Sequence, residues 1–232
     1  MNENTGINQY LVPASVVLAG LLIAGAVMWN NSRPAGSAQP PQGGGQATVD
    51  IKDVKIEGAP FVGNASAPVV IAYWSDYQCP FCKKFDQEAL PQIMEKYVKT
   101  GKAKIVFKDF QFLGPDSDTA ALYSRAVWEL YPTQYAAWHE AMFVAQDAEN
   151  GGFGDEASVQ KLTKTVAGID GAKVIAAVTA NKSAYQAVIA ADRSEAQAFG
   201  ISATPSLVIG KQMIAGAQPY ANFEAAIEAA LK

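Results

Sequence analysis

The chain has 232 residues, half of them hydrophobic, which is enough for one sizeable core with appended segments. Its formal net charge is −4 and no basic run stands out, which argues against nucleic acid as a partner. With two cysteines and one histidine in all, the chain also offers few ligands for a zinc site, which normally takes four.

An uncharged apolar run from Leu11 to Trp29 follows a polar tail of residues 1–10. The run is about long enough to cross a bilayer, and Trp29 at its end suits a membrane interface. We expect a single-pass transmembrane anchor of the signal-anchor kind. A cleaved signal peptide and a buried core helix are the alternatives, although the tail lacks the Lys or Arg of a signal peptide.

The segment from Asn30 to Ala47 is rich in Gly, Pro and Gln and has no apolar periodicity, which predicts a flexible linker. The charges that flank the apolar run are Glu3 and Arg33, and the positive-inside rule applied to them weakly favours a cytoplasmic domain. Because a large domain can be translocated regardless of one arginine, the anchor together with the redox motif described below leads us to expect an extracytoplasmic domain.

The folded part should begin near residue 48. From there to Thr100 the pattern predicts a half-buried strand, a turn-rich stretch, a central strand and a helix with a kink at Pro91, in the ranges Val49–Ile56, Gly58–Ala67, Pro68–Trp74 and Pro80–Lys99. Another strand is expected at Ala103–Phe107.

The rest of the chain is mostly helical in pattern. Helices are expected from Pro115 to about Phe199, with breaks at Pro132, Gly151-Gly152 and Gly168. A short hairpin around Gly210-Lys211 and a closing amphipathic helix should follow, at Ser206–Ile209, Gln212–Ala215 and Ala221–Leu231. The element order therefore predicts an α/β core interrupted by a block of helices.

The only two cysteines lie in the motif Cys79-Pro80-Phe81-Cys82, between a strand and a helix, as in a dithiol redox site. If Pro80 takes the first helical position, its missing N–H costs nothing there. Cys79 then lies at the helix N-terminus, where free amides and the helix dipole favour a thiolate. We expect Cys79 to be the nucleophile and Cys82 the resolving thiol, which releases the partner from a mixed disulfide.

Two other interpretations of the motif are weaker. Half of a zinc site would need further ligands, and His139 is the only histidine. A purely structural disulfide between Cys79 and Cys82 would close so short a loop that it would remove little chain entropy. No metal or cofactor is therefore expected.

From about Gly58 to Lys232 the chain resembles the DsbA-like thiol–disulfide oxidoreductases of the thioredoxin superfamily. Three stretches carry the resemblance, in order: Val69 to Cys82, Val106 to Phe110 with the following Pro115-Asp116-Ser117, and Phe199 to Ile209. The resemblance implies that residues 48–232 form a thioredoxin fold with an inserted α-helical domain at about 115–195.

The resemblance also assigns site residues. Thr204-Pro205 matches the family's cis-proline loop, which would leave backbone of Thr204 open to an extended substrate chain. Strong oxidants of the family carry histidine where this chain has Phe81, so the Cys79 pKa should be less depressed here. Tyr73 stands where relatives often have a buried glutamate, so a proton relay to Cys82 would need another group.

The sequence offers three candidates for that relay, namely Asp76, Lys108 and Asp109, with a turn or cap as the alternative role of Asp76. His139 is read as a structural helix residue. Trp74, Tyr77 and Phe81 are expected either to form an apolar rim around the disulfide or to pack in the core. Pro80, Phe81, Asp76, Thr204 and Pro205 thus complete the expected site around the two cysteines.

We therefore expect a membrane-tethered protein disulfide oxidoreductase that forms disulfides in exported proteins. The resemblance implies a membrane partner, linked to quinone, that reoxidises it. A disulfide isomerase or reductase is the alternative within the same class, and a redox-silent tethered chaperone is the alternative outside it. Because a linker stands where dimeric isomerases carry a dimerisation domain, a monomer is expected.

Overall fold

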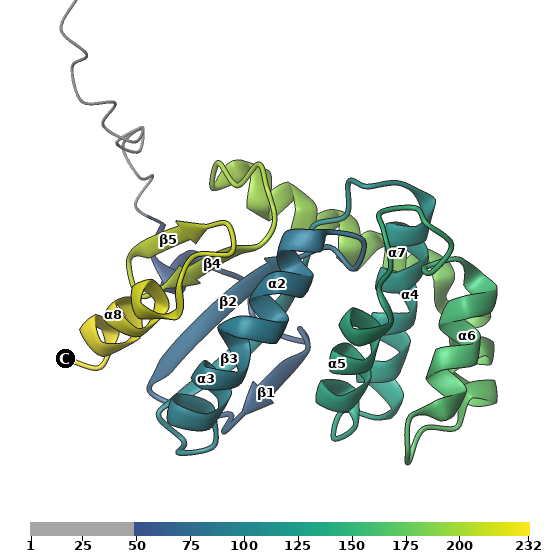
Figure 1. Ribbon diagram of the computed structural model, residues 1–232, viewed down its shortest axis with the longest axis horizontal. Helices are drawn as coiled ribbons and strands as arrows, with labels where there is room; N and C mark the ends of the chain where they lie inside the picture. Colours follow the sequence, from purple (N-terminus) through teal and green to yellow (C-terminus); the bar gives the residue numbers. More distant parts are fainter. Residues whose placement is uncertain (1–48) are drawn as a thin grey trace, which may run out of the picture. The chain divides into compact units, whose positions relative to one another are not determined.

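The computed structural model describes residues 49–232, and the expected tail, anchor and linker at 1–10, 11–29 and 30–47 lie outside the described residues. A five-stranded mixed sheet forms the centre, in the order β1-β3-β2-β4-β5 (Figure 1). The strands are β1 (Phe61–Gly63), β2 (Val69–Ser75), β3 (Ala103–Asp109), β4 (Ser206–Ile209) and β5 (Gln212–Ala215). β2 and β3 are parallel, and the other neighbouring pairs are antiparallel.

β2 is nearly all apolar because both of its faces are buried. Ile71 and Tyr73 point into the larger core, which lies under the helices α2 (Pro80–Glu88) and α8 (Tyr220–Ala230). Ala72 and Trp74 point to the other side, into a smaller core. The strand therefore ends with fixed side chains on both faces, directly before the turn that leads to Cys79.

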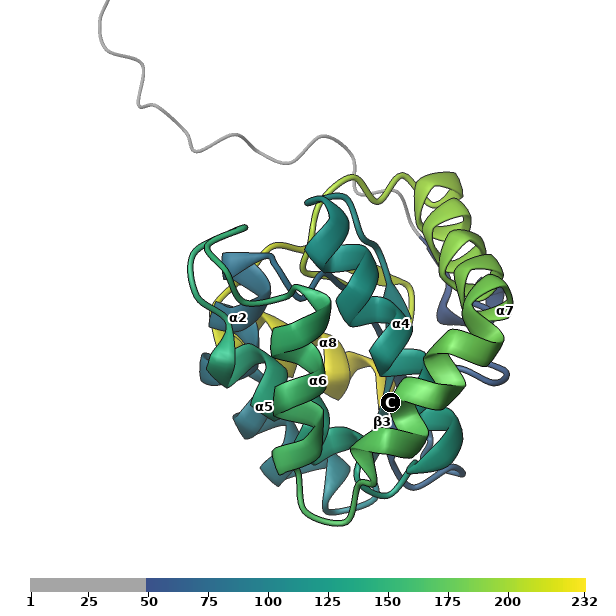
Figure 2. The ribbon, with the colours of Figure 1, turned by 90° about the vertical axis from the view of Figure 1, so that its right-hand side faces the viewer.

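Four helices follow β3 as one block: α4 (Pro115–Leu130), α5 (Tyr135–Ala145), α6 (Glu156–Thr165) and α7 (Gly171–Ala198). They lie beside one another at one end of the sheet, as Figures 1 and 2 both show. α7 packs along α4 and reaches back to β3. The predicted helical block and its three breaks are confirmed, as are the hairpin and the closing helix.

The predicted strand at Val49–Ile56 is wrong. The segment contains the 3-10 turn η1 (Ile51–Asp53), and the Asp50 carboxylate caps this turn by accepting from the Lys52 backbone N–H at 3.0 Å. Its apolar residues pack without sheet pairing, because Val49 and Val54 are buried in the smaller core and Ile51 and Ile56 pack against it on either side of the turn. In the following stretch, which we expected to be rich in turns, the short strand β1 pairs with β3.

The helix predicted at Pro80–Lys99 is interrupted near Pro91. α2 ends at Glu88, α3 (Leu90–Ile93) begins after Ala89, and the π-helical turn η2 (Met94–Val98) completes the segment. Proline lacks the N–H that would bond one turn back, so the hydrogen-bond ladder cannot run through this position. The break leaves α2 as a separate nine-residue helix that carries the cysteine motif.

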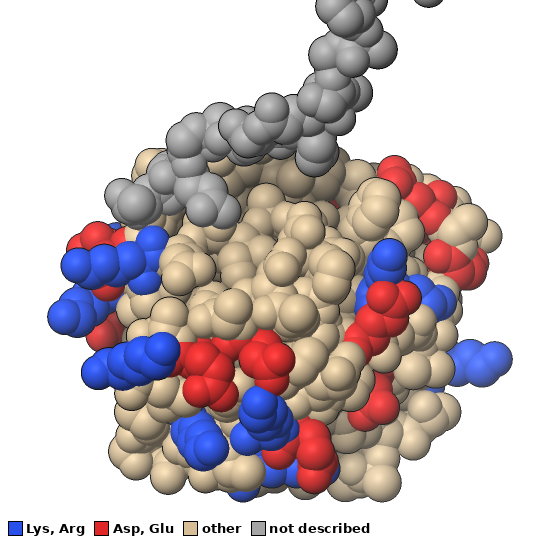
Figure 3. Space-filling model, turned by 60° about the vertical axis from the view of Figure 1, so that its left-hand side comes forward, with Lys and Arg blue, Asp and Glu red and all other residues tan. Residues whose placement is uncertain are grey.

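Charged side chains of both signs lie side by side on the face shown in Figure 3, and they leave a wide uncharged area between them. No single-sign basic patch appears on that face, in keeping with the composition. Within residues 49–232 no helix is both long and apolar enough to cross a membrane.

Candidate active site

The cysteine motif lies where β2 passes into α2. Cys79 is the N-cap of α2 in an extended conformation, and Pro80 takes the first helical position, as predicted. Both cysteines are free thiols, so the structure corresponds to the reduced dithiol. Cys79 is 4% exposed and Cys82 is fully buried, which gives the two sulfurs different environments within one helical turn.

The Cys79 thiol is strongly acidified. A hydrogen bond from the Cys82 thiol is the largest cause, and it lowers the pKa of Cys79 to about 6 against the opposing effect of burial. Thr204 and the backbone N–H groups of Phe81 and Cys82 lower the pKa further. These amides are the free donors of the first helical turn, so the local fold itself stabilises a thiolate at Cys79.

Thr204-Pro205 faces the cysteines and its peptide bond is cis, as the resemblance implied. The Cys79 thiol donates a hydrogen bond to the Thr204 carbonyl oxygen at 3.4 Å. The Thr204 hydroxyl lowers the pKa of both cysteines. It is buried and has no hydrogen-bond partner within the described part of the chain.

Burial raises the pKa of Cys82 well above its ordinary value, and the hydrogen bond that Cys82 gives to Cys79 raises it further. The backbone N–H of Asp76 acts weakly in the opposite direction. At neutral pH the pair therefore consists of a Cys79 thiolate and a Cys82 thiol. This asymmetry matches the division into nucleophile and resolving thiol that the sequence suggested.

The Asp76 carboxylate holds the surrounding loops together. Its Oδ1 accepts from the Gln78 N–H and the Ser117 hydroxyl, and its Oδ2 accepts from the N–H groups of Phe112 and Leu113. Burial raises the pKa of Asp76, while these four bonds lower it. The partners of the carboxylate are loop and helix groups, which fits the turn role rather than the relay role.

Lys108 and Asp109 belong to a buried charge cluster between β3, α4 and α7. Lys108 pairs with Asp192 and Glu195, and Arg125 joins Asp109 to Asp192. Burial raises the pKa of Asp109, with Arg125 opposing it. The cluster ties the helical block to the sheet, and the hydrogen bonds and ion pairs of Lys108 and Asp109 go to groups other than the cysteines.

Of the two roles left open for Trp74, Tyr77 and Phe81, core packing holds for the first two, and only Phe81 lies at the surface. Phe81 is 61% exposed beside the dithiol, whereas Trp74 and Tyr77 are buried. Trp74 lies in the smaller core against Phe199, and Tyr77 stacks on Phe143. Side chains at the end of a strand face the core before the chain turns outward, and so only Phe81, on the first turn of α2, reaches the surface.

Two features of the site depend on contacts that the sequence analysis did not predict. The Gln146 side chain, at the end of α5, donates to the backbone oxygens of Tyr77 and Cys79 and so holds the motif from the helical block. A buried group of polar side chains also lies behind Cys82, formed by Tyr73, Asp86 and His139. Helices far apart in sequence bring these side chains together, so local patterns do not reveal them.

The comparisons with known proteins agree with this geometry. A family model described as thioredoxin matches residues 55–229. The chain belongs to the thioredoxin family. It is 28% identical over 177 residues to disulfide bond formation protein D of Bacillus subtilis (strain 168), across 76% of this chain and 79% of that protein.

Solved structures extend the similarity to the whole described fold. The crystal structure of oxidised BdbD from Bacillus subtilis matches with a TM-score of 0.70 and 27% identity, over 76% of this chain and 95% of that one. Wolbachia pipientis alpha-DsbA1 shares the fold, with a TM-score of 0.67 and 21% identity over 78% and 94% of the two chains. The predicted thioredoxin fold is confirmed, and the protein is a DsbA-like thiol–disulfide oxidoreductase.

Proposed function

We propose that Cys79 and Cys82 are the catalytic pair and that the protein works mainly as an oxidase, which donates its disulfide to exported proteins. The observation that carries the proposal is the low pKa of Cys79, about 6, next to a Cys82 whose pKa is raised. A stabilised thiolate favours the reduced form of the pair, and a pair that is stable when reduced is an oxidant.

The proposed reaction consists of two thiol–disulfide exchanges. A client thiolate attacks the Cys79 sulfur of the Cys79–Cys82 disulfide, the bond between the cysteines breaks, and Cys82 leaves. A second client thiolate then attacks the client sulfur of the mixed disulfide, and Cys79 leaves as the stabilised thiolate. The client loses two electrons and gains a disulfide, while the protein pair is reduced to the state seen in the structure.

Client binding in this proposal uses the surface beside Cys79. The exposed ring of Phe81 offers an apolar contact to an unfolded chain. The backbone of Thr204, in the cis-proline loop, would pair with an extended client segment. Thus Phe81, Thr204 and Pro205 serve recognition and Pro80 shapes the turn, whereas Asp76 supports the loop.

The proposed location is the outer face of the cell membrane, with Leu11–Trp29 as anchor and Asn30–Ala47 as tether. The similarity to a disulfide bond formation protein supports an extracytoplasmic domain, since disulfides persist in oxidising compartments. The reduced pair would then be reoxidised by a membrane partner. The proposed functional unit is a monomer with residues 48–232 as its catalytic domain.

The first experiment is to measure the reduction potential of the Cys79–Cys82 pair by equilibration with glutathione. A value near about −120 mV is that of a disulfide donor, and one near about −270 mV is that of a thioredoxin-like reductant. We expect a value on the oxidising side of about −180 mV, the range of protein disulfide isomerase. A value near the reductant end would overturn the proposed direction and leave the oxidoreductase class intact.

A further inference from the structure

Behind Cys82 a line of buried polar groups runs from β2 through α2 to α5. The Tyr73 hydroxyl donates to Asp86 Oδ2 at 2.7 Å, and Asp86 Oδ1 lies 2.8 Å from His139 Nε2. The other ring nitrogen of His139 lies 2.9 Å from the Tyr77 hydroxyl. Tyr73 is fully buried and His139 is 3% exposed, so these bonds form in a site of low dielectric.

The inner end of this line lies at the Cys82 sulfur. Cys82 and Asp86 are four residues apart on α2 and so share one face of the helix. The Tyr73 hydroxyl, which bonds to Asp86, therefore lies toward the side chain one turn back, and burial, Asp86 and Cys82 all raise the pKa of Tyr73. The ring of Tyr73 is fixed by Phe85, at 4.8 Å between ring centroids.

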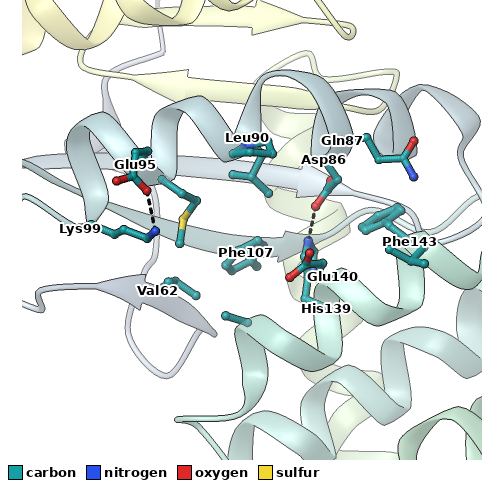
Figure 4. A pocket seen from close by; sticks show the side chains of 14 residues that line it. Val62, Asp86, Gln87, Leu90, Glu95, Lys99, Phe107, His139, Glu140 and Phe143 are labelled. Carbon is teal, nitrogen blue, oxygen red and sulfur yellow. Dashed lines mark hydrogen bonds and ion pairs between the residues drawn. The ribbon is translucent and has the colours of Figure 1, made fainter. Parts of the chain in front are cut away.

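The outer end of the line reaches a pocket. A cavity of about 500 Å³ between α2, α3, β3 and α5 is lined by Asp86 and His139, with Phe107, Phe143 and Glu140 around them. Figure 4 shows Asp86 and His139 joined across it. Cys82 and Tyr73 are absent from the lining. Asp86 and His139 thus connect an enclosed thiol with a space that water can enter.

We propose that Tyr73, Asp86 and His139 form a proton relay that serves Cys82, with Tyr73 as the group that contacts the sulfur and Asp86 and His139 as positioning residues. The need for a relay follows from burial, because no water reaches a sulfur that is 0% exposed. A thiolate that leaves into such a site is costly unless a proton arrives with it.

The relay acts in the first exchange of the reaction. When a thiolate attacks Cys79, the bond between the cysteines breaks and its electron pair stays on the Cys82 sulfur. Tyr73 gives its hydroxyl proton to that sulfur and takes one from the Asp86–His139 pair. The pair in turn takes a proton from water in the pocket. When the disulfide forms again, the same proton returns along the same path. One proton moves in each direction, and no further reactant is needed.

Other polar groups face the line and bear on any pH profile. Tyr77 and Tyr135 from the core and Glu140 from the pocket lie around His139. Ser124 bonds to both tyrosine hydroxyls. Since several groups titrate near the relay, the test rests on rates and isotope effects rather than on a pH optimum.

The test measures how fast glutathione reduces the oxidised full-length protein, by acid quench, alkylation and mass spectrometry, in H₂O and in D₂O. Tyr73→Phe removes the hydroxyl and keeps the ring. Asp86→Asn, which removes the carboxylate that accepts the proton, is the second variant and keeps the test usable if Tyr73→Phe folds poorly. Tyr97→Phe is the matched control, because its buried ring also carries a hydroxyl that donates to a carboxylate, that of Glu228.

We expect Tyr73→Phe and Asp86→Asn to slow reduction at least about tenfold, at the low end of the range for general acid catalysis, and to lose the solvent isotope effect of the unmodified protein. The pH midpoint for alkylation of Cys79 should stay unchanged in both. Rates within twofold of the unmodified protein with the isotope effect retained, or equal slowing by Tyr97→Phe, would overturn the relay.

This proposal rests on the dithiol chemistry of the proposed function, and the two can fail separately. A reductant-like potential would overturn the oxidase assignment and leave the relay measurable, since glutathione drives the same exchange. An oxidising potential with an unaffected Tyr73→Phe variant would remove the relay alone.

Discussion

The Cys79 sulfur lies 3.4 Å from the carbonyl oxygen of Thr204, although 125 residues separate the two in the chain. β4 brings them together, because it pairs with β2 and begins directly after the cis-proline loop. The side of the dithiol that faces a client is therefore formed by two distant segments. The acidity of Cys79 depends on both of them.

The first prediction concerns the titration of Cys79. Its rate of alkylation by iodoacetamide in the reduced protein should rise with pH around a midpoint of about 6, because the Cys82 thiol and the helix amides stabilise the thiolate. A midpoint near 8.5, the ordinary value for a free cysteine, would contradict the site geometry. Cys82→Ser, which keeps a donor beside Cys79, is the control that isolates the single thiol.

The same titration predicts how the stability of the reduced protein depends on pH. The pKa of Cys79 is lower in the folded than in the unfolded chain, so its contribution is present above the unfolded value and is lost as pH falls toward about 6. Reduced protein should therefore lose stability toward urea between about pH 8.5 and 6 relative to oxidised protein, which lacks both thiols. Equal pH dependence of the two forms would contradict this.

The second prediction concerns the Thr204 hydroxyl. Thr204→Val keeps the shape of the side chain and removes the donor that lowers the pKa of both cysteines. The alkylation midpoint of Cys79 should rise and the measured potential should become less oxidising. Thr204→Ser retains the hydroxyl and is the control, with a midpoint closer to that of the unmodified protein. Equal midpoints in all three proteins would exclude a role for the hydroxyl.

The cysteine site was largely predictable because its chemistry is local. Cys79, Pro80 and Cys82 lie within four consecutive positions, so helix geometry alone places the nucleophile at the N-cap. Thr204-Pro205 could be placed only through the family resemblance. The helices of the inserted block could also be predicted, since the breaks between them are marked by glycines and a proline.

The remaining parts depend on contacts that no local pattern contains. The alternation at Val49–Ile56 suggested a strand, yet its apolar residues pack in or against the smaller core without sheet pairing. His139 looked like an isolated helix residue, because its partner Asp86 lies 53 positions earlier. Trp74 is apolar and next to the motif, but the strand turns it into the smaller core.

The third prediction concerns the residue between the cysteines. Phe81→His would place an imidazole on the exposed first turn of α2, where a positive charge stabilises the neighbouring thiolate. The Cys79 midpoint should fall below about 6 and the potential should become more positive, by about 30 mV for each 1.4 kcal/mol of added stabilisation. Phe81→Leu, which adds no charge, is the control. A potential equal to that of this control would contradict the prediction.

The fourth prediction concerns the buried charge cluster. Arg125→Met leaves the carboxylates of Asp109 and Asp192 without their shared partner in the interior. The variant should lose about 3–5 kcal/mol of stability in urea unfolding of the oxidised protein, as expected when one member of a buried ion group is removed. Lys99→Met breaks the exposed pair with Glu95 and should cost at most about 1 kcal/mol. Similar losses in the two variants would contradict a structural role for the cluster.

The fifth prediction separates support of the loop from proton transfer. Asp76→Asn leaves one oxygen to face four donors and turns its amide toward N–H groups, so each buried donor left unpaired should cost about 1–3 kcal/mol. Urea unfolding of the oxidised protein measures the loss, and Asp118→Asn on the exposed face of α4 is the control. Because the Asp76 carboxylate bonds to loop groups, the variant should keep the solvent isotope effect on reduction by glutathione. Loss of that effect in Asp76→Asn, with Tyr73→Phe unaffected, would move the proton path from the Tyr73–Asp86–His139 line to Asp76.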